Sequence, residues 1–246
     1  MPARPAAGGR AAVMTLDDGP ATDVALVGRK AANLARARRL GLPVLPGFVV
    51  TTEDTPAIAR DGVEARRAVL EAVWAAASAL ATEIVVRSSS SAEDGEESSM
   101  AGRFASVLGV RTWPAFTAAV AEVVASGAAV GGAGAGGGHM AVLVQPQIHP
   151  AWGGVWFGVD PVTGERDRVV VAAVRGGPDA LVSGSATGAR YTLSRRGRLL
   201  QADEPDPAVE LPARPLRAVD HLGRRAGLAF GGPQDVEWAV TAEGSV

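Results

Sequence analysis

The spacing of apolar residues predicts alternating helices and strands in the first half of the chain. Between Gly28 and Leu40 an apolar residue recurs at every third position. The last turn of this segment is rich in arginine, and Gly41 follows it, which predicts a helix that ends at a glycine. The run 88–102 is polar, rich in small residues and aperiodic, so it predicts a loop. The same criteria predict strands at 44–51, 84–86 and 104–110 and helices at 65–80 and near 115–125.

The second half alternates short apolar runs with turns. Strands are expected at 140–144, 154–159, 169–174, 191–193 and 236–240, and helices near 178–182 and 215–230. Strands and helices do not alternate strictly, which favours an α+β fold over a doubly wound sheet.

Glycine and alanine set the predicted domain limits. Residues 1–23 lack a period and predict an N-terminal tail, and the almost pure Gly/Ala run 131–139 predicts a linker. The run lacks the Gly-Lys-Ser/Thr ending of a phosphate-binding Walker loop. Two subdomains are therefore expected, at 24–130 and 140–246.

Composition excludes several function classes. A net charge of -2, from 24 basic and 26 acidic residues, gives no basic stripe for nucleic acid. With no cysteine, a bound metal must be held by oxygen or imidazole. No run approaches the ~20 apolar residues that span a bilayer, so we expect no membrane partner and a cytoplasmic protein.

Lys30 is the one lysine among the 24 basic residues. The bias toward arginine, alanine and glycine is typical of a GC-rich genome, so a lone lysine can arise by chance. The functional interpretation is that a compact, flexible ammonium is required there, because the planar fork of arginine is not equivalent on a phosphate.

Four blocks, in order along the chain, resemble the ATP-binding domain of the phosphoenolpyruvate synthase, pyruvate phosphate dikinase and rifampin phosphotransferase family. The resemblance implies an ATP-grasp-like fold, with two subdomains enclosing a nucleotide cleft that holds ATP and Mg²⁺. The blocks are Val27-Gly-Arg-Lys-Ala-Ala-Asn-Leu34 with the proline-glycine strand 40–52, Val86-Arg-Ser-Ser-Ser-Ser-Ala-Glu-Asp94 with 100–106, 140–145 with 154–164 and 179–184, and Pro233-Gln-Asp-Val-Glu-Trp-Ala239.

The resemblance assigns roles within the first three blocks. Lys30 and Arg87 contact the phosphates as catalytic residues, and Gln145, at a hinge strand, recognises adenine. Arg103 stands where many members carry glutamine, and Asp179 replaces a family glutamate in a ribose or metal role. The further expected nucleotide contacts are Gly102, Ser106, Gln147 and Ile148.

Elementary chemistry supports the roles of Lys30 and Arg87 and also offers alternatives. Lys30 lies in the first turn of a predicted helix, whose N–H groups attract an anion. Arg87 leaves a buried strand and can hold a phosphate bidentately, or it can pair with Glu93 or Asp94. The Gln145 strand can equally be core followed by a turn.

Glu237 is the predicted magnesium ligand. It alternates with Val236 and Trp238, so its carboxylate points to the opposite face of the strand. Mg²⁺ bridging phosphates requires such an oxygen ligand, and the alternative is a solvated charge at the strand edge. Asp235 shares its face and is the second candidate.

The resemblance implies a dikinase-type phosphotransferase that donates phosphoryl from Mg-ATP to a histidine on a separate swivelling domain, with AMP as a product. The Ser-His-Ala-type motif of that domain and the glutamine that follows the Glu-Trp strand do not occur in these 246 residues. A noncatalytic nucleotide-binding module and a carboxylate-activating ATP-grasp ligase are the alternative hypotheses. The final phosphoryl acceptor and the oligomeric state stay open.

Overall fold

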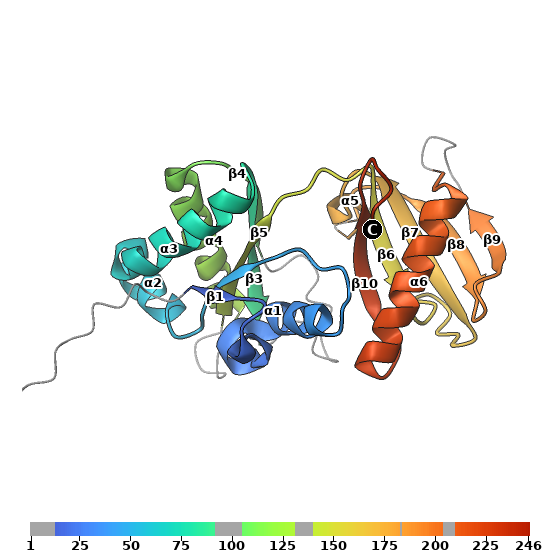
Figure 1. The fold of residues 1–246 in the computed structure, drawn as a ribbon, viewed down its shortest axis with the longest axis horizontal. Coiled ribbons are helices and arrows are strands. Elements are labelled where there is room, and N and C mark those ends of the chain that lie inside the picture. Colours follow the sequence, from blue (N-terminus) through green and yellow to red (C-terminus); the bar gives the residue numbers. More distant parts are fainter. Residues whose placement is uncertain (1–12, 92–104, 131–139, 183, 204–209) are drawn as a thin grey trace, which may run out of the picture. The chain divides into compact units, whose positions relative to one another are not determined.

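The computed structural model describes residues 13–91, 105–130, 140–182, 184–203 and 210–246 (Figure 1). These residues form helices and two five-stranded sheets in which every pairing is antiparallel, so the predicted α+β class is confirmed. Contacts divide the chain into two compact units. The first contains the described residues up to Arg39 together with Val44–Gln147, and the second contains Leu40–Pro43 with Ile148–Val246.

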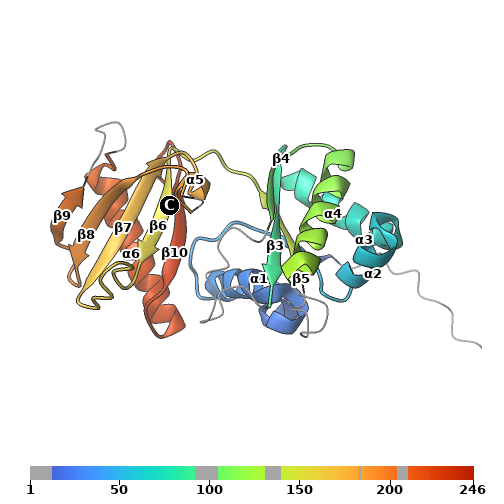
Figure 2. The same cartoon turned by 180° about the vertical axis from the view of Figure 1, so that it is seen from behind.

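The first unit is a sheet of order β1-β2-β5-β3-β4 with helices on both faces (Figure 2). Its strands are β1 (Met14–Thr15), β2 (Phe48–Val50), β3 (Ile84–Ser90), β4 (Ser106–Val110) and β5 (Met140–Pro146). Its helices are η1 (Gly19–Thr22), α1 (Val24–Arg39), α2 (Thr55–Asp61), η2 (Val63–Arg66), α3 (Arg67–Leu80) and α4 (Trp113–Val130).

The two faces of this sheet bury separate cores. Val86 and Val144 pack with Leu70 of α3 and Phe116 of α4 on one face. Leu143, next to Val144 on β5, packs on the other face with Ala31 and other small residues of α1. The alternation of side chains along β5 therefore places α1 opposite α3 and α4.

The fold begins earlier than predicted. Residues 1–23 were expected to form a tail, but Met14 and Thr15 pair with β2, and Leu16 and Ala21 are fully buried. The short apolar residues here lack a readable period, because they fill gaps under α1 and do not form a long element of their own.

The predicted loop 88–102 is wrong in its first part. Strand β3 continues through the serines to Ser90, because Ser88 and Ser90 pair with Val142 and Met140 of β5. Polar serine is tolerated in a buried strand when its hydroxyl is hydrogen-bonded.

The second unit is a sheet of order β10-β6-β7-β8-β9. It contains β6 (Trp152–Phe157), β7 (Arg168–Arg175), β8 (Ala189–Ser194), β9 (Leu199–Asp203) and β10 (Asp235–Val240), with the short α5 (Asp179–Val182) and the long α6 (Ala213–Phe230). Trp152, Trp156 and Trp238 pack with Leu216 and Val219 of α6 on one face of the sheet. Strand β9 was not predicted, because all of its residues are exposed and it shows no alternation.

The predicted subdomain limit requires correction. Residues 140–246 were assigned to one subdomain, but β5 lies between β2 and β3 in the first sheet, so the first unit extends to Gln147. The Gly/Ala run 131–139 lies outside the described residues. Its composition resembles a linker, but it connects two elements of the same unit, α4 and β5.

In the described part of the chain, no helix combines the length and apolarity that a membrane span requires.

Gly223 permits the close approach of α6 to its sheet. A Cβ atom at this position would lie 2.1 Å from Cδ2 of Trp156. We predict that Gly223→Ala destabilises the second unit by about 1–3 kcal/mol, the usual cost of overpacking, despite the better helix propensity of alanine. Urea unfolding followed by tryptophan fluorescence measures the change.

Gly227→Ala on the same helix is the matched control, because its Cβ would meet its nearest atom, the carbonyl oxygen of Gly232, at 3.3 Å. Equal unfolding midpoints for the two variants would show that α6 does not depend on contact with Trp156.

Candidate functional site

The Ser89 hydroxyl joins β3 to the start of the helix that carries Lys30. Its Oγ donates to the carbonyl of Val27 at 2.7 Å and accepts from the N–H of Ala31 at 3.0 Å. Ser89 is fully buried. A distant serine thus satisfies an N–H in the first turn of a helix, the task that a local N-cap residue usually performs.

Gly28 makes this contact possible. It interrupts α1 with φ 75° and ψ 168°, a conformation that favours glycine. A Cβ atom at Gly28 would lie 1.9 Å from the carbonyl oxygen of Ser89. The predicted helix at 28–40 is therefore the second part of α1, and it restarts directly against β3.

Lys30, Arg87 and Ser106 lie together at one corner of the first unit. The Lys30 Nζ is 3.5 Å from the carbonyl oxygen of Ser88, the residue that follows Arg87. Arg87 is opposite Ser106 in the β3–β4 pairing, so the two side chains share a face. The register opposite Leu143 shows that this is the face covered by α1.

The neighbouring Arg29 is also tied to this corner, through a hydrogen bond from its guanidinium to the carbonyl of Ser91 at 3.3 Å. Glu93 and Asp94, the predicted alternative partners of Arg87, lie outside the described residues. Gly102 and Arg103 do so as well. Lys30 and Arg87 both make further interactions, so neither is a free cation.

The predicted adenine-hinge residues lie at the end of β5 and directly after it, and their side chains differ in partners and burial. The Gln145 side chain is buried, and its Nε2 donates to the carbonyls of Leu45 at 3.2 Å and Pro46 at 3.4 Å. Gln147 accepts from the N–H of Gly109 at 2.6 Å. These bonds fit the core-and-turn interpretation, whereas Ile148 is 37% exposed.

Glu237 and Asp235 lie on one face of β10 in the second unit. Both are exposed, whereas Trp238 and Val240 are buried against α6. The carboxylates therefore point away from α6, on the other face of the sheet.

Arg190 shares the face of Glu237. Glu237 pairs with Val155, Val155 with Ala172, and Ala172 with Arg190, so the four residues form one row across β10, β6, β7 and β8.

Asp179 begins α5, which contacts β6 and β7. Gly153 of β6 permits the close approach of the segment that leads into α5, because a Cβ atom at 153 would lie 2.7 Å from the carbonyl oxygen of Gly176.

Asp160 fixes the turn between β6 and β7. Its Oδ1 accepts from the N–H of Val162 at 2.9 Å, from the N–H of Thr163 at 3.3 Å and from the Arg190 guanidinium at 2.7 Å. Burial raises the pKa of the Asp160 carboxyl, but these hydrogen bonds and the Arg190 charge outweigh it, so the pKa is lowered.

A metal site built from several carboxylates or imidazoles is not found in the part of the chain that the structure describes. Among the described residues there is no group of three or more His, Cys, Asp or Glu side chains placed to hold an ion. Mg²⁺ usually uses one or two carboxylates together with substrate phosphates and water, so Glu237 and Asp235 fit this donor set.

Comparison with known proteins decides the family. The family described as "Pyruvate phosphate dikinase, AMP/ATP-binding domain" matches residues 61–210. The chain belongs to this family. The matched range contains Arg87 and Asp179, and it ends before Glu237 and begins after Lys30.

Relatives of this dikinase-domain family match most of the chain. The chain is 26% identical to a "Probable phosphoenolpyruvate synthase" of Methanothermobacter thermautotrophicus over 89% of its length, and 30% identical to a "Rifampicin phosphotransferase" of Streptomyces sviceus over 93%. It is 25% identical to the "Prodigiosin synthesizing transferase PigC" of Serratia marcescens over 87%. The chain spans 42%, 34% and 30% of these three relatives.

The role of Ser89 was missed by sequence reasoning, which treated the serine run as a loop offering hydroxyl groups. The signal available was Gly28, a glycine directly before a helix-forming segment that already contains Lys30. Glycine there indicates close backbone approach, but it does not identify the partner.

We predict that Ser89→Ala destabilises the first unit by about 1–3 kcal/mol, because the Ala31 N–H and the Val27 carbonyl lose their buried partner. Urea unfolding measures the loss. Ser78→Ala, at an exposed serine of α3, is the control and should change stability by less than ~0.5 kcal/mol. Equal effects of both substitutions would contradict the proposed link between β3 and α1.

Asp160→Asn should destabilise the second unit by about 1–3 kcal/mol at pH 7, because Arg190 loses a buried anionic partner. The folded-state pKa of Asp160 is lowered, so its stabilisation is present above the unfolded-state pKa and is lost as pH falls through the folded-state value. The difference between the unfolding free energies of the two proteins, measured between pH 7 and pH 2, should shrink as pH falls below the unfolded-state pKa. A difference that stays constant over this range would contradict the role of the ionised carboxylate.

Proposed function

We propose that this dikinase-family domain binds Mg-ATP and transfers the β,γ-diphosphate of ATP to a histidine on a separate domain, releasing AMP; cleavage of the terminal phosphate by water or inorganic phosphate then leaves a phosphorylated histidine. The observation that carries the proposal is the corner formed by Lys30, Arg87 and Ser106 at the restart of α1. Two cations beside a helix N-terminus supply the charge and the N–H donors that a triphosphate requires.

The two units have different tasks in this proposal. In the first, the Lys30 ammonium contacts phosphate oxygens as a flexible point charge, and the Arg87 guanidinium holds them bidentately while charge redistributes. In the second, Glu237 and Asp235 would hold Mg²⁺, which neutralises phosphate charge when bound. An ATP-grasp-like architecture follows from the same proposal.

Residue roles in adenosine recognition are assigned by resemblance. The backbone of 145–148 would contact adenine, and Asp179 would serve the ribose or the metal. The buried hydrogen bonds of Gln145 hold this segment against the 45–46 backbone, which supports a backbone contribution to adenine binding more than a side-chain contribution.

Lys30→Ala should weaken ATP binding about 10- to 100-fold, as expected for loss of a charge-assisted hydrogen bond. Calorimetry with ATP and magnesium measures it. Arg36→Ala, at the opposite end of α1, should leave the affinity unchanged, and Lys30→Arg should restore it only partly because the fork differs from an ammonium. Unchanged affinity in Lys30→Ala would mean that the lone lysine is an accident of composition.

Turnover separates the dikinase from a noncatalytic module. The chain is mixed with ATP, magnesium and the histidine-bearing domain of a phosphoenolpyruvate synthase, and nucleotides are resolved by chromatography. AMP formation supports the proposal. ADP as the sole product contradicts it, and binding without turnover favours the noncatalytic alternative.

A further inference from the structure

Four arginines of the second unit make no side-chain hydrogen bond or ion pair within the described part of the chain. They are Arg196 and Arg198 in the β8–β9 turn and Arg214 and Arg217 on α6, and all four are exposed. Nearby arginines differ, since Arg224 donates to Asp220 and to the carbonyl of Ser194. We call these four residues the arginine surface.

A small apolar cavity of about 220 Å³ lies between α6 and the β8–β9 turn, and Arg217 is the member of the arginine surface that lines it. Gly197, which separates Arg196 from Arg198, and Arg217 both line it, so the turn and the helix meet there. The other lining residues are Leu193, Leu199, Ala213, Leu216 and Asp220. Small-molecule sites usually have ~300–1,000 Å³, so this volume fits one anchoring side chain better than a whole ligand.

The one acidic residue that lines the cavity is already compensated. Asp220 accepts from the Trp156 Nε1 at 3.2 Å and from the Arg224 Nε at 2.9 Å, and it is only 7% exposed. Among the described residues, Arg217 is therefore the one charged side chain lining the cavity that has no such compensation.

Among the described strands, β9 is an edge strand, and its Leu199 lines the same cavity. It is the last strand of the sheet order, and among the described strands it pairs only with β8. Leu199 and Leu200 are 48% and 45% exposed on it. Exposed edge strands with apolar side chains present unpaired N–H and C=O groups to an extended chain.

We propose that the arginine surface docks an extended, acidic polypeptide segment that places one apolar side chain in the cavity. The forked guanidinium groups match carboxylates, and the leucines select an apolar anchor. Single-stranded nucleic acid fits less well, because its sites use exposed aromatic platforms, whereas Trp152, Trp156, Trp238 and Tyr191 of this unit are buried.

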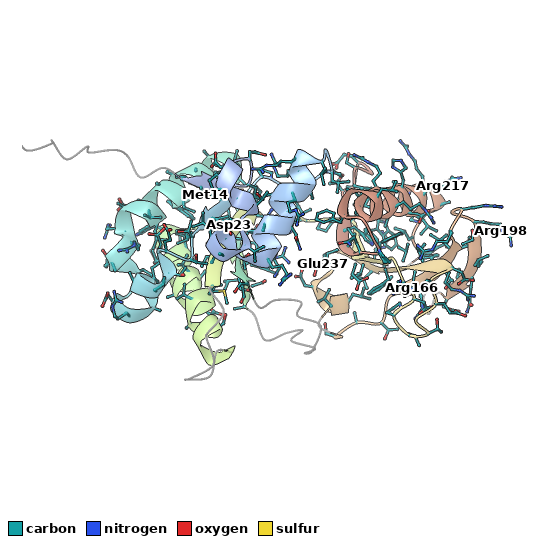
Figure 3. The ribbon with its side chains drawn as sticks, turned by 90° about the horizontal axis from the view of Figure 1, so that it is seen from below. Met14, Asp23, Arg166, Arg198, Arg217 and Glu237 are labelled. Atoms are coloured by element: carbon teal, nitrogen blue, oxygen red, sulfur yellow. The ribbon has the colours of Figure 1, made fainter. Side chains whose placement is uncertain are left out.

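The docking surface is separate from the proposed nucleotide residues of the same unit. The cavity lies on the α6 face of the sheet, and Glu237 points from the other face. Figure 3 shows Arg198 and Arg217 well apart from Glu237. Docking and ATP binding are therefore measurable independently, and failure of one does not imply failure of the other.

The test uses fluorescein-labelled peptides and the full chain. One peptide has two central leucines flanked by five glutamates on each side, and a second has serines in place of the leucines. Fluorescence anisotropy should show tighter binding of the leucine peptide, with affinity falling as NaCl rises from 50 to 300 mM.

Arg217→Glu should weaken binding of the leucine peptide about tenfold, because one attraction becomes a repulsion. Arg60→Glu, an equivalent change at an exposed arginine of α2, should have no effect. Ala213→Leu, which fills the cavity without changing charge, should remove the preference for leucine over serine. ATP affinity should be unchanged in all three variants.

Three results would overturn the proposal: absence of peptide binding, equal loss in Arg217→Glu and Arg60→Glu, or tighter binding of an oligothymidylate of the same charge than of the leucine peptide.

Discussion

The arrangement of the first unit depends on the hydrogen bonds of one buried hydroxyl group. The Ser89 Oγ bonds to the backbone of Val27 and of Ala31, on either side of the break at Gly28. These bonds fix the helix that carries Lys30 against the strand that carries Arg87. Two cationic residues from distant segments, Lys30 and Arg87, thereby reach one corner of the first unit.

Sequence patterns predicted the long elements well and the buried polar ones poorly. The helices at α1, α3, α4 and α6 and the apolar strands β5, β6 and β7 follow from periodicity, because burial of one face dictates their side chains. The extension of β3 through Ser88–Ser90 could not be predicted in this way. Its serines are buried by tertiary pairing with β5, a constraint that local composition does not contain.

The candidate site was predictable to a similar degree. The phosphate-binding roles of Lys30 and Arg87 come from resemblance and stay predictions, whereas alternation along β10 correctly placed Glu237 and Asp235 on the face opposite Trp238. Ser89 and Arg190 were not identified, because their partners are distant in sequence. Arg190 meets Asp160 across 30 positions, and Ser89 meets Val27 across 62. The subdomain limit at 140 was misplaced for a related reason, since a Gly/Ala-rich composition does not reveal which sheet the next strand joins.

The most direct test of the central claim is a double-mutant cycle for ATP binding, with Lys30→Ala, Arg87→Ala and both changes measured by calorimetry in magnesium. If both cations hold the same triphosphate, their effects should be coupled by at least ~0.5 kcal/mol, as for residues that share a ligand. Additive effects within that limit, or a single change with no effect, would contradict the claim that this corner of the first unit holds the phosphates of ATP.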